Sequence, residues 1–485
     1  MYAYMKLCIF TILTTLSLAA CAQTAQTATP PSTAASPALE GETATPPAVT
    51  EGTSTPKPTP APTSTLMPLE LEKIETFSDN CSEMDLDLTA ERLSLIAYVP
   101  SGFCFHGELD LFETGGRVYV AQVSMKSLPR STEAFRIIDV TDVEHPVQVG
   151  AWKWNVPTAL STYTADVKAF RQGERWFLAV SRDPGLPDST LYPLCSLVGG
   201  IAIVEVTEPA DPRIITVVNG KNTESKKNWC KSHTAEVSRD ANGNGAYLYV
   251  SAVDIFDLRV LDIRDLEHVT EVGHYTHPDA GFYNQRNIFF VHDTTIVGDR
   301  VYVAHWSAGL IILDRQALEA GEEVEPLNPL DSIAPWGLQI HQAYPTTDGQ
   351  FVFVEDEFPA KTPESRLRLY DIRDLQAPRE VAAITLADSW GAPHNLLVSG
   401  NKLFVGWYQD GVRVFQYDTR DPEHPSVQPY AFQAVRKEFT TNPYTDIFDG
   451  IWGVRVHDCL VGGQPRTCVY ASDLTWGLLI LAMEP

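Results

Sequence analysis

Five histidines occupy the same place in a repeated pattern, each at the start of a short strand-like stretch: His106, His233, His292, His341 and His394. The chain has only 12 histidines among 485 residues, so this recurrence is selective. Imidazole rings are the commonest protein ligands for copper, zinc, iron and nickel. If the rings came together, each would disfavour protonation of the others and keep them in the neutral form that binds a metal. The pattern therefore predicts a transition-metal site, with copper or zinc as the candidate ion.

The repeat that carries these histidines is defined by a strand-like hexapeptide. Its seven copies are AFRIID (134–139), GIAIVE (200–205), DLRVLD (257–262), GLIILD (309–314), RLRLYD (366–371), GVRVFQ (411–416) and GLLILA (477–482). Before each copy lies a strand rich in β-branched and aromatic residues, such as RVYVAQV (117–123), and before that a shorter first strand. A fourth strand typically follows. A repeat of this size built only from strands indicates an all-β, seven-bladed β-propeller of four-stranded blades.

The last repeat lacks a fourth strand, because the sequence stops at Pro485 just after the third. An unassigned strand, RLSLIAYV (92–99), precedes the first blade. An open blade edge is unfavourable, so we expect this N-terminal strand to complete the last blade and close the ring. The propeller is thereby expected to span residues 73–485.

The first strand of a propeller blade lines the central channel, so the five histidines should converge near one mouth. His292, His341 and His394 come from consecutive blades and are the preferred ligands. Blade 2 has Asp166, and blade 7 has Trp452-Gly453, where the other blades have histidine. Two acidic segments that end second strands, VEDEF (354–358) and Asp473, are expected elsewhere along the channel or at its opposite mouth.

Two other interpretations of the histidines stay open at this stage. A histidine repeated at one blade position can form hydrogen bonds within and between blades, because buried polar groups need partners. The rings could also line a metal-free pocket for a small ligand. No other catalytic motif stands out, since the sequence has no Gly-x-Ser-x-Gly, phosphate loop or His-Glu-x-x-His.

The N-terminus has the pattern of an exported lipoprotein. A short apolar run ends in Leu18-Ala19-Ala20-Cys21, and residues 1–21 are typical of a signal peptide whose cysteine, Cys21, becomes acylated. Residues 22–72 are mostly Thr, Pro, Ala and Ser, a composition that favours a disordered, extended linker. We therefore expect export and a lipid anchor outside the cytoplasm of a bacterium, with membrane contact only through the lipid.

Cysteine usage and charge agree with export. Six cysteines follow Cys21 and are disulfide candidates: Cys81, Cys104, Cys195, Cys230, Cys459 and Cys468. The nearest pairs are Cys459–Cys468, which would close a hairpin, Cys195–Cys230 and Cys81–Cys104, although six cysteines allow fifteen pairings. The formal net charge of −26 repels phosphate backbones and makes nucleic acid an unfavourable partner.

The repeat resembles known surface proteins. The phrase IIDVTDVEHPVQVG (137–150) resembles the LVIVD repeat of bacterial surface propellers. The C-terminal half, with HQAYPTTDGQFVFVEDEF (341–358) and PHNLLVSGNKLFVGWYQDGVRVF (393–415), is similar to proteins called choice-of-anchor B. The resemblance covers roughly residues 100–485 and implies a secreted propeller held by a variable anchor; it implies no settled activity.

Three functions are compatible with these observations. The leading one is a lipid-anchored, monomeric cell-surface propeller that binds an unidentified extracellular ligand or protein, a hypothesis that rests partly on fold analogy. The first alternative is a metal-dependent enzyme, for example an oxidase like the copper propellers of the selenium-binding family, which would use the histidine ring. The second alternative is a structural component of the cell envelope.

Overall fold

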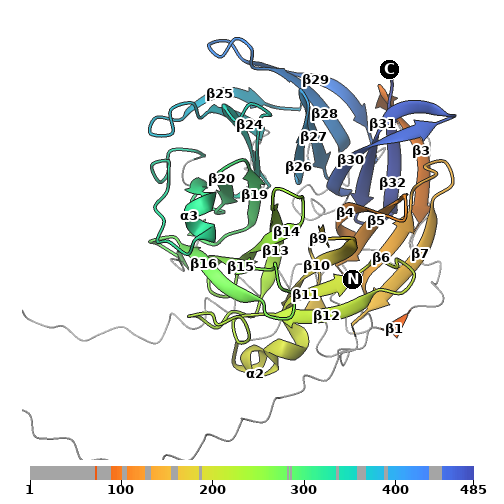
Figure 1. The fold of residues 1–485 in the computed structure, drawn as a ribbon. Coiled ribbons are helices and arrows are strands. Elements are labelled where there is room, and N and C mark those ends of the chain that lie inside the picture. Colours follow the sequence, from red (N-terminus) through yellow and green to blue (C-terminus); the bar gives the residue numbers. More distant parts are fainter. Residues whose placement is uncertain are drawn as a thin grey trace, which may run out of the picture. The chain divides into compact units, whose positions relative to one another are not determined.

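Seven antiparallel β-sheets are arranged as blades around a common centre in the computed structural model (Figure 1). The structure describes residues 72–73, 89–100, 106–125, 133–154, 162–184, 188–280, 283–284, 287–334, 338–357, 367–386, 391–435 and 450–485, all within a unit that spans residues 69–485. The expected signal peptide, Cys21, almost all of the linker, Cys81 and Cys104 lie outside the described residues. The propeller prediction is confirmed.

Each blade begins with its channel-facing strand and continues outward in chain order. Blade 1 has β4 (His106–Thr114), β5 (Arg117–Ser124), β6 (Glu133–Asp139) and β7 (Val147–Lys153); blade 2 has β9 (Val167–Gln172), β10 (Arg175–Pro184), β11 (Gly200–Glu205) and β12 (Arg213–Val218), with β8 (Thr162–Tyr163) against β10. Blade 3 has β13 (Ser232–Arg239), β14 (Gly245–Ala252), β15 (Asp257–Asp262) and β16 (Thr270–Thr276). A two-stranded ribbon, β17 (Tyr283–Asn284) and β18 (Asn287–Ile288), leads to blade 4.

The remaining blades repeat this order. Blade 4 has β19 (Asp293–Val297), β20 (Arg300–Ala304) and β21 (Leu310–Asp314); blade 5 has β22 (Ile340–Pro345), β23 (Phe351–Asp356), β24 (Leu367–Asp371) and β25 (Arg379–Ile384). Blade 6 has β26 (Leu396–Ser399), β27 (Lys402–Trp407), β28 (Gly411–Asp418) and β29 (Ser426–Gln433); blade 7 has β30 (Ile451–Val461), β31 (Gln464–Asp473) and β32 (Gly477–Met483). Among the described residues, helix α2 (Asp188–Val198) connects β10 to β11 in blade 2, and helix α3 (Arg315–Glu319) follows β21 in blade 4.

Ring closure follows the sequence prediction. The N-terminal strand β3 (Leu93–Pro100) pairs antiparallel with β32, from Leu93 opposite Met483 to Pro100 opposite Gly477. Two shorter segments add to neighbouring blades: β1 (Glu72–Lys73) pairs with β7, and β2 (Ala90–Glu91) pairs with β29. The N-terminal part of the body therefore supplies the last strand of blade 7 and extends two other outer edges.

Blade 4 completes its outer edge without a regular fourth strand. The segment after α3 runs along β21 instead, where Leu327 N–H donates to Ile312 O at 2.8 Å and Leu310 N–H donates to Ile333 O at 3.2 Å. The side chain of Asn328 also accepts from Ile312 N–H at 2.8 Å. These bonds satisfy backbone N–H and C=O groups of β21 that would otherwise pair with a regular fourth strand.

The blades pack through apolar faces, and two disulfides reinforce them. For example, Tyr302 and Ile312 of blade 4 share a buried cluster with Val352 and Val354 of blade 5. The disulfides Cys195–Cys230 and Cys459–Cys468 are formed, and the second crosses the β30–β31 hairpin, as predicted. Such covalent links restrict the unfolded chain and so favour the folded one.

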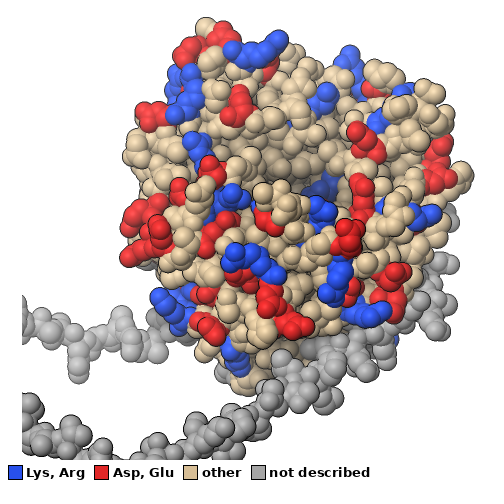
Figure 2. Space-filling view, in the orientation of Figure 1, with Lys and Arg blue, Asp and Glu red and all other residues tan. Residues whose placement is uncertain are grey.

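Figure 2 shows the molecule hollowed at the centre of the ring, with acidic and basic side chains interspersed over this face. None of the helices among the described residues is both long and apolar enough to cross a bilayer.

Candidate metal centre

Four of the five predicted histidines form a continuous row across consecutive blades. The ring centroids are 4.7 Å apart between His233 and His292, 4.2 Å between His292 and His341, and 3.9 Å between His341 and His394. Trp452 of blade 7 extends the row, because its ring lies 4.0 Å from that of His394. The structure therefore brings together the three preferred ligands, with His233 beside them.

His106 is not one of the residues that these ring contacts join, and the strand register explains why. His106 pairs with Ser124 just as Ile340 pairs with Asp356, one residue before His341. The position that corresponds to His341 in blade 1 is therefore Gly107. His106 therefore lies one residue before the position from which the histidines of the row extend. The prediction of a five-membered ring is wrong by this one blade.

The same comparison shows that Asp166 does not occupy the histidine position of blade 2. Asp166 O accepts from Ser181 N–H, as Asn395 O accepts from Gly406 N–H in blade 6. Asp166 thus corresponds to Asn395, the residue after His394, and Ala165 holds the histidine position. Blades 1 and 2 therefore have small residues, Gly107 and Ala165, at the position where blades 3 to 6 have histidine.

The acidic residues that end β23 lie beside the histidines, contrary to the sequence prediction. Ile340 pairs with Asp356, so antiparallel pairing returns the end of the second strand to the start of the first. Glu357 follows β23 and is 4% exposed. Neighbouring blades place Trp306 and Tyr408 at the corresponding position after their own second strands. Glu357 is therefore a candidate ligand that the sequence reasoning missed.

Two imidazoles and one carboxylate cluster closely, and a third imidazole lies beside the carboxylate. Ligand atoms of His292, His341 and Glu357 all lie within 4.8 Å of one another. His394 Nε2 lies 3.8 Å from Glu357 Oε1, and its other nitrogen, Nδ1, donates to Trp452 O at 2.7 Å. That bond fixes the tautomer and leaves Nε2 unprotonated, the arrangement usual for metal-ligating histidine. Donors bonded tetrahedrally to an ion at about 2.0–2.2 Å lie about 3.3–3.6 Å apart, so the side chains would have to move slightly closer to bind one ion.

Several ligand atoms have no hydrogen-bond partner within the described part of the chain. His292 Nδ1 and His394 Nε2 are fully buried and form no hydrogen bond there. His341 Nδ1 lies 2.7 Å from Glu355 Oε1, close enough for electrostatic attraction but without the orientation of a hydrogen bond. Buried polar atoms left in this state are unusual in native proteins and are explained by a bound ion or water.

The electrostatics of the centre favour a cation. Burial, with a smaller contribution from the neighbouring histidines, holds the pKa of His292 and His341 well below its usual value and lowers the pKa of His394 to about 3. Burial raises the pKa of Glu357 to about 7 and that of Glu355 well above its usual range. The rings are therefore neutral at pH 7, whereas both carboxyl groups favour the protonated form; a bound cation would lower their pKa and ionise them.

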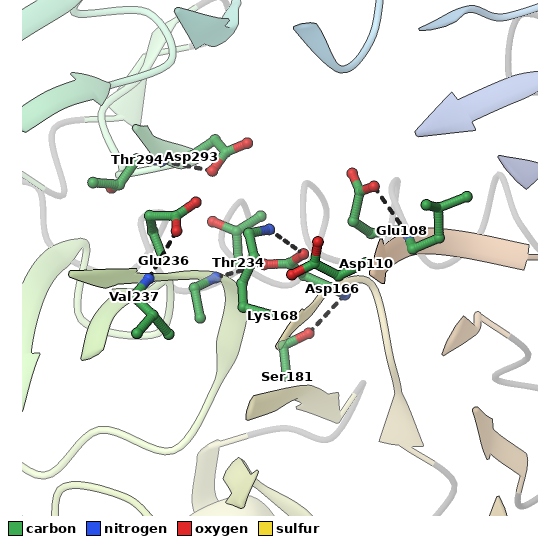
Figure 3. Close-up of polar contacts among 12 residues, drawn as sticks. Glu108, Asp110, Asp166, Lys168, Ser181, Thr234, Glu236, Val237, Asp293 and Thr294 are labelled. Carbon is green, nitrogen blue, oxygen red and sulfur yellow. Dashed lines mark hydrogen bonds and ion pairs between the residues drawn. The ribbon is translucent and has the colours of Figure 1, made fainter. Parts of the chain in front are cut away.

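Deeper in the channel, a second polar layer has a structural explanation (Figure 3). Asp166 accepts from Lys168 Nζ at 2.6 Å and from Ala235 N–H of the next blade at 2.7 Å. Its backbone N–H in turn donates to Ser181 Oγ at 2.9 Å. These contacts pair Asp166 with Lys168 and tie adjacent inner strands together.

Comparisons with known proteins show no matching family model and no matching curated sequence. Among solved structures, the chain is similar to a protein from Lactobacillus plantarum, with 13% identity over 75% of this chain and 94% of that chain, at a TM-score of 0.49. A Bacteroides fragilis protein provisionally described as a 6-phosphogluconolactonase matches at 11% identity over 76% and 95% of the two chains, with a TM-score of 0.46. The extracellular domain of a one-component system from B. thetaiotaomicron matches at 12% identity over 80% of this chain and 39% of that chain, with a TM-score of 0.44.

Proposed function

We propose that this protein is a metal-binding propeller whose channel mouth holds one transition-metal ion through His292, His341, His394 and Glu357. The observation that carries the proposal is the cluster of His292, His341 and Glu357, whose ligand atoms lie within 4.8 Å of one another, with His394 Nε2 3.8 Å from Glu357 Oε1. All four side chains are buried and come from three consecutive blades. A structural role for the histidines alone would leave buried ring nitrogens unsatisfied, whereas a metal ion would use them.

The donor set selects the class of metal. Imidazole nitrogen suits copper, zinc, iron and nickel, while calcium and magnesium prefer oxygen ligands only. Three neutral rings and one carboxylate suit copper or zinc, the ions that the sequence suggested. A bound ion could supply Lewis acidity or, if it is copper, electron transfer. The metal-dependent enzyme considered above thus has a candidate centre, while ligand binding at the cell surface stays the broader hypothesis.

We also propose that the protein is exported and anchored by lipid at Cys21, as a monomeric body held on a linker. Two disulfides in the body support an oxidising compartment, where such bonds persist. The pattern at residues 18–21 and the resemblance to LVIVD-repeat and choice-of-anchor B proteins support the anchor. An extracellular ligand or protein is the kind of partner that this location would offer.

Metal analysis of the full-length protein tests the proposal. Protein made in an oxidising compartment and purified without chelator should contain about one equivalent of copper or zinc. His341→Ala should lose that metal, whereas the control His424→Ala should keep it, because His424 is exposed and pairs with Asp421 at an outer turn. Equal metal content in both variants, or no uptake by wild type after dialysis against either metal, would reject the site.

A further inference from the structure

One phenol is bonded directly to the carboxylate of the proposed centre. Tyr408 Oη donates to Glu357 Oε1 at 2.6 Å, and both side chains are buried. The Tyr408 ring also lies beside His394, with centroids 5.0 Å apart, and edge-on to Trp452 at 6.1 Å. Tyr408 therefore contacts two proposed ligands at once, although the function proposed above assigns it no role.

The backbone of Tyr408 is held in an uncommon conformation. Its φ is +29°, a region that bulky residues rarely adopt. The carbonyl of Tyr408 accepts from Gly411 N–H at 3.0 Å and from Ile451 N–H at 2.9 Å. A side chain at Gly450, whose φ is +106°, would collide with that carbonyl, because a Cβ would lie 2.1 Å from it. The surrounding backbone thus determines where the tyrosine points.

Blade 4 has a residue with the same uncommon backbone conformation on the other side of Glu357. Trp306 has a φ of +45°, and its ring stacks on His292 with centroids 4.7 Å apart. Its carbonyl accepts from Gly309 N–H and Ile340 N–H, both at 3.2 Å. Strained residues that the surrounding structure enforces are concentrated at functional sites. Two such residues at corresponding blade positions, both against proposed ligands, point to a requirement for fixed side-chain orientation.

We propose that Tyr408 is a positioning residue that makes Glu357 a one-oxygen ligand. This inference rests on the proposed metal-binding function. The phenol occupies a lone pair of Oε1 and fixes the rotation of the carboxylate, so that both of its oxygens cannot turn toward the ion together. Hydrogen bonds from outside the ligand set commonly orient metal ligands in this way, and losing one typically weakens metal binding 10–100-fold.

The test compares Tyr408→Phe with wild type in the full-length protein loaded with Co²⁺ as a spectroscopic substitute for zinc. Tyr249→Phe is the control, because Tyr249 is also buried and its phenol donates to Glu319 Oε1 at 3.1 Å, in blades 3 and 4. We expect Tyr408→Phe to bind Co²⁺ about 10–100-fold more weakly. Its visible absorption should also weaken as the coordination number rises above four, while Tyr249→Phe should match wild type in both respects.

A double-variant comparison separates positioning from general destabilisation. In a Glu357→Gln background, adding Tyr408→Phe should cause little further loss of affinity, because the bond that it removes no longer orients a charged ligand. If wild type binds no Co²⁺, the proposed metal site itself fails. If wild type binds Co²⁺ and Tyr408→Phe keeps the same affinity and spectrum, the metal site stands and the positioning role is rejected. Additive losses in the double variant would likewise reject it.

Discussion

The substitution His394→Ala should separate a metal ligand from a histidine that only stabilises the fold. In the metal-free protein, the ring donates one hydrogen bond to Trp452 O and packs against His341 and Trp452. Its Nε2, however, is buried without a hydrogen-bond partner among the described residues. Losing the bond costs about 1 kcal/mol, while removing an unsatisfied buried nitrogen recovers about 1–3 kcal/mol. Lost packing offsets part of that gain, so the free energy of unfolding of the metal-free variant should lie within about 2 kcal/mol of the wild-type value.

The metal-loaded protein should behave differently. A ligand that binds only the folded state at 100 times its Kd stabilises that state by about 2.7 kcal/mol. The entropy of unfolding is about 2 cal/mol/K per residue, so residues 93–485 give about 0.8 kcal/mol/K. Saturating zinc or copper should therefore raise the Tm of wild type by about 3 °C, and His394→Ala should lose most of that rise.

Differential scanning calorimetry with and without metal measures both quantities on the same samples. The exposed residue His268, bonded to Asp265 at an outer turn, supplies the control variant His268→Ala. That control should retain the full metal-dependent rise. A His394→Ala protein that melts several degrees below wild type without metal, yet gains the same increment from metal, would show that the histidine is structural and would refute the reasoning.

Three further predictions concern the rest of the chain. Deleting residues 1–88 should leave a folded body, whereas deleting residues 1–100 removes β3, exposes β32 and should cause aggregation or a large loss of thermal stability; equal melting of the two would exclude β3 as the lock. Burial raises the pKa of Asp254 to about 6, so the folded state binds its proton more tightly than the unfolded state, and stability falls as pH rises from about 4 to 6. Asp254→Asn should therefore be more stable than wild type at pH 7 by about 1–3 kcal/mol in urea unfolding, and a less stable variant would contradict the sign. Metabolic lipid labelling should mark wild type but not Cys21→Ser, and persistent labelling of the variant would disprove anchoring at Cys21.

The fold was predictable because the repeated pattern of strands can be recognised in the sequence. Seven copies of one hexapeptide, each flanked by strand-like segments, leave few architectures other than a propeller. The closing role of β3 also followed, since an unpaired strand at one end of the chain matched a missing strand at the other. The irregular outer edge of blade 4 did not follow, because its segment pairs through Asn328 and a few backbone bonds rather than through an alternating pattern.

The site was predictable only in part, and register explains the difference. Histidine at the start of a first strand correctly placed His292, His341 and His394 in one row, because they share a register. Blades 1 and 5 both have a register irregularity at the start of the first strand that cannot be seen in the sequence, so the one-residue shift of His106 relative to His341 was missed.

Glu357 was missed for a different reason, one that reaches beyond this molecule. In an antiparallel blade, the end of the second strand always returns to the start of the first, so the residue after each second strand belongs to the same mouth as the histidines. Reading those positions together gives Trp306, Glu357 and Tyr408 from consecutive blades, beside His292, His341 and His394. Two positions in each blade therefore line the channel mouth: the start of the first strand and the residue after the second strand. An acidic residue at the latter position, together with a histidine at the former, indicates a candidate metal centre in such a fold.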